Sequence, residues 1–178
     1  MIQELATEEL QSFGPASFED LGGNGQIEIL IRDRFYFGLP LRFASSPLLI
    51  VQMKGSRFVD VSSRFWPVFE KEIRQERRKL NNQQMQKFRH PNADQIRDAD
   101  YKRTKSTVLL IILDYMNAGR PEEAKEALRE LWPSDSQVHV WWEMLREYCS
   151  PYESSGLRRG LKLDASPACA EYWSGRDP

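Results

Sequence analysis

TVLLIILDYMNAGRPEEAKEALRELWPSDSQVHVWWEMLREY, residues 107–148, decides the fold, because it carries the strongest apolar pattern of the chain. Between residues 121 and 131, apolar side chains recur at i, i+3, i+4 and i+7, the spacing of one helical face. Gly119 is suited to end a preceding helix, and Pro121 to begin the next one. A second apolar stripe follows in Val138, Trp141, Trp142, Leu145 and Tyr148. The pattern predicts helices over residues 121–132 and 135–148.

Residues 108–113, VLLIIL, are apolar throughout and fit a buried helix or a buried strand. Val108, Ile111 and Ile112 lie at helical spacing, which favours a helix. The same three side chains are β-branched, which favours a strand. We favour a helix over residues 107–118 and keep the strand as the alternative, because the choice bears on function.

The N-terminal third of the chain indicates a small, mostly antiparallel sheet over about residues 26–61. Its strands are expected at QIEILIR (26–32), LLIVQM (48–53) and residues 57–61. LGGNG at residues 21–25 is a glycine-rich turn into the first strand, and Lys54-Gly55 turns into the last. A short helix over residues 2–13 is expected before this sheet, and an edge strand or a bent connection is expected within residues 35–43.

A charged helix is expected to follow the sheet. Pro67 suits its first turn, and a thin apolar stripe extends it to about residue 88. Residues 94–105 are polar and are expected to form a mobile connection or a short helix. Together these elements predict an α+β fold, with the sheet packed on a helical C-terminal half.

The composition is that of an ordinary globular chain: 178 residues, 40% hydrophobic and 29% charged, with a net charge of −1. This length suits one domain, expected over residues 1–150 and followed by an irregular tail at 151–178. The small net charge does not indicate binding to nucleic acid or to an acidic membrane. The longest apolar run is far too short to span a membrane, so no membrane partner is expected.

The chain has two cysteines, Cys149 and Cys169, without a C-x-x-C pair or a disulfide framework. This usage suits a reducing cytosol and predicts a soluble, cytoplasmic protein. Cys149 follows the last apolar stripe and is interpreted as a small buried apolar residue.

Residues 107–133 resemble the helical hairpin of tetratricopeptide-type repeats. The resemblance rests on an apolar helix, the turn at Gly119, and Ala124 as the small residue where two helices touch. Such hairpins generally serve as binding surfaces, so the resemblance implies a protein partner rather than a reaction. An ordinary pair of core-packing helices is the alternative.

Most enzymatic signatures are absent from the sequence, including H-E-x-x-H, G-x-S-x-G and the P-loop. Trp141 and Trp142 are adjacent, and adjacent helical side chains diverge by about 100°. One of them is therefore expected to contact a partner, unless both are buried between the tail and the sheet. We expect a non-catalytic protein-interaction or assembly role without a cofactor, for a partner that the sequence does not name.

The alternative is a metal-dependent nuclease or its inactive DNA-binding relative. LIVQMK at residues 49–54 resembles the strand ending in (D/E/Q)-x-K of restriction-endonuclease-like nucleases, and GGNGQIE at residues 22–28 resembles the glycine-rich turn and acidic strand of the Mrr-type enzymes. The resemblance implies that Glu28 and Gln52 hold Mg²⁺ and that Lys54 orients the attacking water. It also requires residues 108–113 to form a strand.

Arg74, Arg77 and Arg78 lie in the charged helix and could contact the phosphates of a nucleic acid. Glu70 and Glu76 interleave with them. A solvated face of i, i+4 ion pairs is therefore the competing interpretation.

Overall fold

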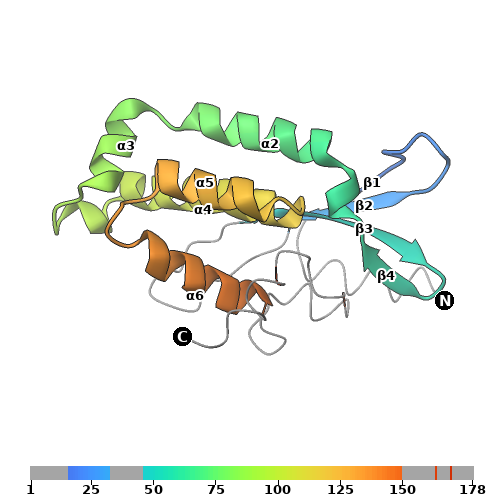
Figure 1. Cartoon of the computed structure of the whole chain (residues 1–178). Coiled ribbons are helices and arrows are strands. Elements are labelled where there is room, and N and C mark those ends of the chain that lie inside the picture. Colours follow the sequence, from blue (N-terminus) through green and yellow to red (C-terminus); the bar gives the residue numbers. More distant parts are fainter. Residues whose placement is uncertain (1–15, 33–45, 150–162, 164–168, 170–178) are drawn as a thin grey trace.

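The computed structural model describes residues 16–32, 46–149, 163 and 169, with the side chain of residue 147 left aside. Three predicted regions lie outside these ranges: the helix at residues 2–13, the edge strand or bent connection at residues 35–43, and all but two residues of the tail. The elements occur in the order β1 (Ala16–Glu19), β2 (Glu28–Arg32), β3 (Leu48–Lys54), β4 (Arg57–Asp60), η1 (Ser62–Arg64), α2 (Trp66–Lys79), α3 (Asn82–Arg89), η2 (Gln95–Arg97), α4 (Ala99–Asn117), α5 (Pro121–Leu131) and α6 (Gln137–Cys149). The expected α+β architecture is confirmed (Figure 1).

The four strands form one antiparallel sheet in the order β1-β2-β3-β4. The strands expected around residues 26–32, 48–53 and 57–61 are confirmed. Strand β1 was not predicted; it pairs with β2, and the glycine-rich turn connects the two strands. This strand has only four residues, mostly exposed, so it carries no apolar alternation to reveal it.

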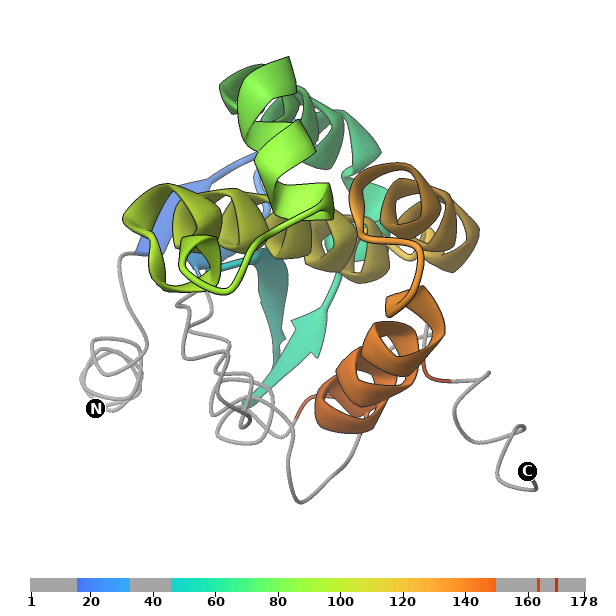
Figure 2. The same cartoon turned by 90° about the vertical axis from the view of Figure 1, so that its left-hand side faces the viewer.

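Helix α4 is the centre of the helical half (Figure 2). It lies between the sheet and the α2–α3 pair, and α5 packs along it. Residues 108–113 are helical, as favoured, and are buried. The helix begins at Ala99 rather than at residue 107, because Asp98 caps it by accepting a hydrogen bond from the backbone N–H of Asp100 (3.3 Å). Of the two alternatives for residues 94–105, a mobile connection or a short helix, the helix is therefore confirmed from Ala99 onward, as the first turns of α4.

The charged helix expected over residues 67–88 is two helices. Leu80 has an extended backbone (φ −83°, ψ 114°), which ends α2. The Asn81 side chain then accepts a hydrogen bond from the backbone N–H of Gln84 (2.8 Å), which starts α3. The prediction of a single long helix is therefore wrong, because the capping hydrogen bond of Asn81 competes with continuation of α2.

Gly119 makes the turn between α4 and α5. Its φ of +71° favours glycine, and a Cβ there would lie 3.0 Å from the Cβ of Ser63. The turn closes through hydrogen bonds from the backbone N–H of Gly119 to Met116 O (3.0 Å) and of Arg120 to Tyr115 O (2.9 Å). The turn expected at Gly119 is therefore confirmed, and it packs against the start of the helical half.

The sheet has two different faces. Leu48 and Ile50 point into the main core, together with the buried side chains of the helices. The alternate residues of the same strands form a second buried cluster on the far face, made of Ile29, Ile31, Leu49 and Val51. Leu163, from beyond α6, packs against that second cluster.

A polar clamp, consisting of Asp114, Asn117, Tyr148 and the backbone of Leu48, joins the helices to the first residue of β3. The N–H of Leu48 donates to Asp114 Oδ1 (2.8 Å), and Asn117 Nδ2 donates to Leu48 O (2.7 Å). The Tyr148 hydroxyl of α6 donates to Asn117 Oδ1 (2.6 Å). One turn of α4 therefore satisfies both backbone groups of Leu48 and holds α6 in place.

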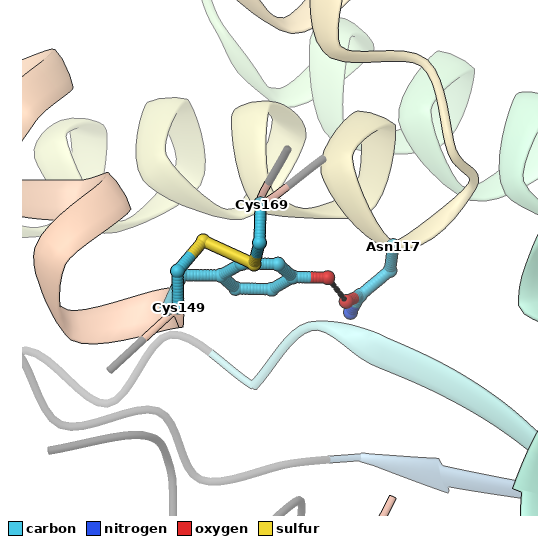
Figure 3. The surroundings of a disulfide bond; sticks show 4 residues. Asn117, Cys149 and Cys169 are labelled. Atoms are coloured by element: carbon cyan, nitrogen blue, oxygen red, sulfur yellow. Dashed lines mark hydrogen bonds between the residues drawn. A yellow bond between two sulfur atoms is a disulfide. The ribbon is translucent and has the colours of Figure 1, made fainter. Parts of the chain in front are cut away.

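A disulfide lies next to the clamp (Figure 3). It joins Cys149, the last residue of α6, to Cys169, with 5.4 Å between their Cα atoms. Both residues are buried. The interpretation of Cys149 as simply a small apolar residue is therefore wrong, because its sulfur is bonded across 20 residues of chain. In the part of the chain that the structure describes, no helix is both long and apolar enough to cross a membrane.

Candidate interaction site between α5 and α6

The two adjacent tryptophans of α6 have different surroundings. Trp141 is 7% exposed and belongs to the core, whereas Trp142 is 41% exposed. Val138, one turn earlier, is 73% exposed. The predicted divergence of the two tryptophans is confirmed. The inclusion of Val138 and Trp142 in a single buried stripe is wrong, because α6 contacts the rest of the protein along a narrower face than its apolar pattern indicates.

A shallow hollow of about 320 Å³ lies where these side chains meet α5. It is lined by Lys125, Leu128, Arg129, Gln137, Val138, Trp141 and Trp142. Leu128 and Trp141 are buried, whereas Val138 and Trp142 are exposed at its rim. An exposed tryptophan beside an apolar hollow is typical of a contact residue in a protein–protein interface.

Gln137 fixes the angle at which α6 leaves α5. Its side-chain Nε2 donates to the carbonyl of Trp132 (2.9 Å) and to that of Arg129 (3.1 Å), which satisfies carbonyls at the end of α5. The indole N–H of Trp132 donates to the hydroxyl of Ser136 (3.1 Å). The hollow is therefore a built feature of the helix–helix connection rather than a gap between loose segments.

The charge at the hollow is basic. Lys125 Nζ lies 5.6 Å from the ring centroid of Trp141 and 3.1 Å from a carboxylate oxygen of Glu122. Arg129 is exposed on the next turn of α5. The buried indole N–H of Trp141 is one of two buried side-chain polar atoms without a hydrogen-bond partner in the described ranges. A buried donor without an acceptor costs about 1–3 kcal/mol.

The structure brings two of the three candidate nuclease residues together. Glu28 and Gln52 are directly paired across β2 and β3, and Gln52 Nε2 donates to Glu28 Oε1 (3.0 Å). Glu28 Oε2 accepts from the backbone N–H of Leu21 (2.9 Å), and Gln52 Nε2 also donates to Gln26 Oε1 (2.7 Å). Both carboxylate oxygens of Glu28 are therefore engaged: Oε2 supports the turn of the β1–β2 hairpin, and Oε1 joins β2 to β3.

Lys54 lies two residues after Gln52, on the same face of β3, and is exposed. The strand that the nuclease resemblance requires at residues 108–113 is part of α4, so the sheet of a restriction-endonuclease-like fold is not completed there. Within the described ranges, no group of three or more His, Cys, Asp or Glu side chains is arranged to hold a metal ion.

The basic helix α2 is ion-paired at two of its three candidate positions. Arg74 pairs with Glu70 at 3.0 Å, four residues earlier, and Arg77 contacts both carboxylate oxygens of Glu130 at 2.9 and 3.0 Å. Arg78 is exposed and lines a shallow hollow along α2. The ion-paired interpretation therefore describes Arg74 and Arg77.

Asp114 is a strongly perturbed titratable group among the described residues, and it was not predicted from the sequence as a site residue. It is fully buried, and burial raises the pKa of its carboxyl to about 8, although the hydrogen bond from Leu48 and the charge of Arg32 lower it. Its second oxygen, Oδ2, has no hydrogen-bond partner among the described residues. An acid within an apolar helical run was the available signal. We interpret Asp114 as part of the polar clamp rather than as a catalytic group, because it is sealed from solvent.

Comparison with known proteins finds no relative: no family model, no curated protein and no solved structure matches the chain.

Proposed function

We propose that the protein is a non-catalytic interaction or assembly protein, and that the hollow between α5 and α6 binds an apolar side chain of a partner protein. The observation that carries this proposal is the exposure of Trp142 (41%) directly beside the buried Trp141 (7%). Exposing a large aromatic side chain to water has a free-energy cost that association recovers. Tryptophan is also enriched among residues that dominate binding energy.

The surroundings of Trp142 indicate what the partner offers. Val138 and Trp142 provide apolar walls, and Lys125 and Arg129 provide positive charge on the α5 side. An apolar anchor flanked by a carboxylate or carbonyl oxygen matches this hollow.

The test is affinity purification of a partner with the wild-type chain, followed by reconstitution with that partner once purified. Trp142→Ala is expected to weaken binding by about tenfold or more, as truncation of a contact tryptophan commonly does. Ile96→Ala is the matched control, because Ile96 is 50% exposed on η2 and lies outside the hollow. Retention of the partner by Trp142→Ala at wild-type affinity would exclude the hollow as the binding site.

The second candidate function is the metal-dependent nuclease, or a DNA-binding relative of one. The observation in its favour is the direct pairing of Glu28 with Gln52 two residues before Lys54. The helical state of residues 108–113 and the hydrogen bonds already made by Glu28 count against it. Mg²⁺- or Mn²⁺-dependent DNA cleavage that disappears in Lys54→Ala would establish this function in place of the first.

A cytoplasmic location stays a prediction, and the bond between Cys149 and Cys169 provides its test. Disulfides persist in oxidising compartments and are rare where glutathione and thioredoxin keep thiols reduced. Acid-quenched cells should be treated with a thiol-alkylating reagent before and after reduction. Alkylation of both cysteines before reduction would support the cytoplasm, and protection of both would place the protein in an oxidising compartment.

A further inference from the structure

The outward face of α5 carries charges that alternate in sign. The helix lies at the outer edge of the helical half, beyond α4, and its apolar residues are buried (Figure 1, Figure 2). Its opposite side carries Glu122, Lys125, Glu126 and Arg129, which share one helical face because of their i, i+3, i+4, i+7 spacing. We call these side chains the charged face. Lys125 and Arg129 line the hollow, but the two glutamates balance them, so the charged face as a whole favours neither a strongly acidic nor a strongly basic partner.

The two halves of the charged face differ in how their charges are satisfied. Lys125 Nζ donates to Glu122 Oε1, three residues earlier (3.1 Å). Glu126 and Arg129 have the same spacing and are exposed, but their side chains make no ion pair or hydrogen bond within residues 16–32 and 46–149. One acid and one base of the charged face are therefore open to charges from outside the chain.

Neighbouring charges on the two helices do not compensate Glu126 and Arg129. Glu130 of α5 contacts Arg77 of α2 with both carboxylate oxygens (2.9 and 3.0 Å). On α6, Arg146 donates to Glu143 (2.7 Å). These side chains already have partners of opposite charge within the chain.

The order of the charges is complementary to itself in the antiparallel direction. The midpoint between residues 122 and 129 is also the midpoint between residues 125 and 126. When two α5 helices lie antiparallel about this midpoint, Glu122 of each copy faces Arg129 of the other, and Lys125 of each faces Glu126. A parallel pair would place like charges opposite each other. An interface of this kind, in which both copies use the same surface, is that of a twofold dimer.

The apolar part of the site obeys the same symmetry. A twofold axis between antiparallel α5 helices keeps α6 on the same side in both copies, so Val138 and Trp142 of one copy face those of the other. These side chains are 73 and 41% exposed. Trp142 and Lys125 both line the hollow, which places Trp142 next to the centre of the charged face. Each copy therefore offers an exposed apolar side chain at the hollow of the other.

We propose that the partner bound by the hollow is a second copy of this chain, in a twofold dimer with antiparallel α5 helices. This inference rests on the proposed function, because it names the partner of the same site. Association removes Val138 and Trp142 from water and gives Glu126 and Arg129 neighbours of opposite charge.

The test is the oligomeric state of the full chain, measured by sedimentation over a range of protein concentrations. The wild type should form dimers that dissociate on dilution and, because the charges are exposed, more readily as salt is raised. Trp142→Ala should weaken the dimer by about tenfold or more. Arg78→Glu on α2 and Ile96→Ala on η2 are controls, because both residues are exposed and lie outside the charged face and the hollow.

Charge reversal tests the antiparallel register. Glu122→Arg places two arginines opposite each other, and Arg129→Glu places two glutamates opposite each other, so each should weaken the dimer by about tenfold. The double variant, Glu122→Arg with Arg129→Glu, exchanges the two charges and should recover the affinity of the wild type. Both of its substitutions are unfavourable to the helix dipole, so its recovery would not come from a more stable helix. Melting temperatures of all variants show whether each remains folded.

A wild type that stays monomeric at every concentration would overturn this inference. So would a dimer that Trp142→Ala does not weaken, or a double variant that associates no better than the two single ones. A monomeric chain that binds a different protein through Trp142 would overturn this inference alone and leave the proposed function intact.

Discussion

The two ends of the four-stranded sheet belong to the same antiparallel ladder but differ in what surrounds them. At the end where β3 begins, the polar clamp satisfies both backbone groups of Leu48, and the disulfide lies beside it. At the hairpin end, Phe18, Ile27 and Met53 are exposed, and Lys54 opposes Arg57. The polar clamp and the disulfide therefore hold the first of these ends to the helices, whereas the second end leaves apolar side chains exposed.

The same division occurs within α6. Trp141 and Tyr148 bind the helix to the core, whereas Val138 and Trp142 face solvent beside the hollow. Exposed and buried residues are thus neighbours in the sequence of α6. Substitutions at the two kinds of position should have different consequences, and the following predictions use that difference.

The largest expected effect is a pH dependence of stability caused by Asp114. Burial raises the pKa of its carboxyl from 3.8 to about 8, so between these values the folded chain keeps a proton that the unfolded chain has released. The contribution of Asp114 to the free energy of unfolding should therefore be largest below about pH 4. It should fall by up to about 1.4 kcal/mol per pH unit between about pH 4 and about pH 8.

Denaturant unfolding of Asp114→Asn across this pH range checks the prediction. The amide keeps an oxygen that can accept from the N–H of Leu48 but cannot ionise. Its stability profile should be flatter than that of the wild type, with the two diverging as pH rises. Parallel profiles would mean that Asp114 is ionised in the folded protein.

Loss of the disulfide is expected to lower the free energy of unfolding by about 3 kcal/mol, the usual effect for a closed loop of this size. Unfolding should be compared with and without a thiol reductant, and for Cys149→Ser with Cys169→Ser. The double variant should match the reduced wild type and be insensitive to the reductant. Two titratable thiols in unreduced, unfolded protein would show that the bond does not form.

Asn117→Ala should cost about 2 kcal/mol, because it removes a hydrogen bond to Leu48 O and leaves the Tyr148 hydroxyl without its acceptor. Asn82→Ala is the matched control, since Asn82 is an exposed helical residue. Chemical denaturation of both variants gives the comparison. Equal stability of the two variants would show that the polar clamp does not stabilise the contact between the helices and the sheet.

The smallest effect on stability is expected at the hairpin end. Phe18→Ser and Met53→Ser each remove an exposed side chain and should change the free energy of unfolding by no more than about 0.5 kcal/mol. If either variant lost several times that amount, the comparison between the two ends of the sheet would fail, because Phe18 or Met53 would then be part of the core.

Strong periodicity made the helical half predictable from the sequence. The stripe in α5 and the turn at Gly119 specify their elements almost alone, and the buried run at residues 108–113 was correctly favoured as helix. Short elements were not predictable in this way. β1 has no alternation to detect, and the break between α2 and α3 depends on one asparagine cap.

The candidate surfaces were predictable only in part. The divergence of Trp141 and Trp142 follows from helix geometry, but which of them is exposed depends on where α5 lies. Val138 was predicted to be buried because the apolar pattern of α6 does not show which part of the helix the rest of the protein covers. The polar clamp and the disulfide join residues between 20 and 69 positions apart, and no local pattern encodes such contacts. The positive pair at Lys54 and Arg57 emerges only from the strand register.

The measurement that tests the account most directly compares Trp141→Ala with Trp142→Ala in the same unfolding and partner-binding experiments. Trp141→Ala should lose about 3–5 kcal/mol of stability, as expected for truncation of a buried aromatic residue. Trp142→Ala should lose about 1 kcal/mol or less yet release the partner. Comparable losses of stability in both variants, or retention of the partner by Trp142→Ala, would contradict the assignment of Trp142 to a contact surface.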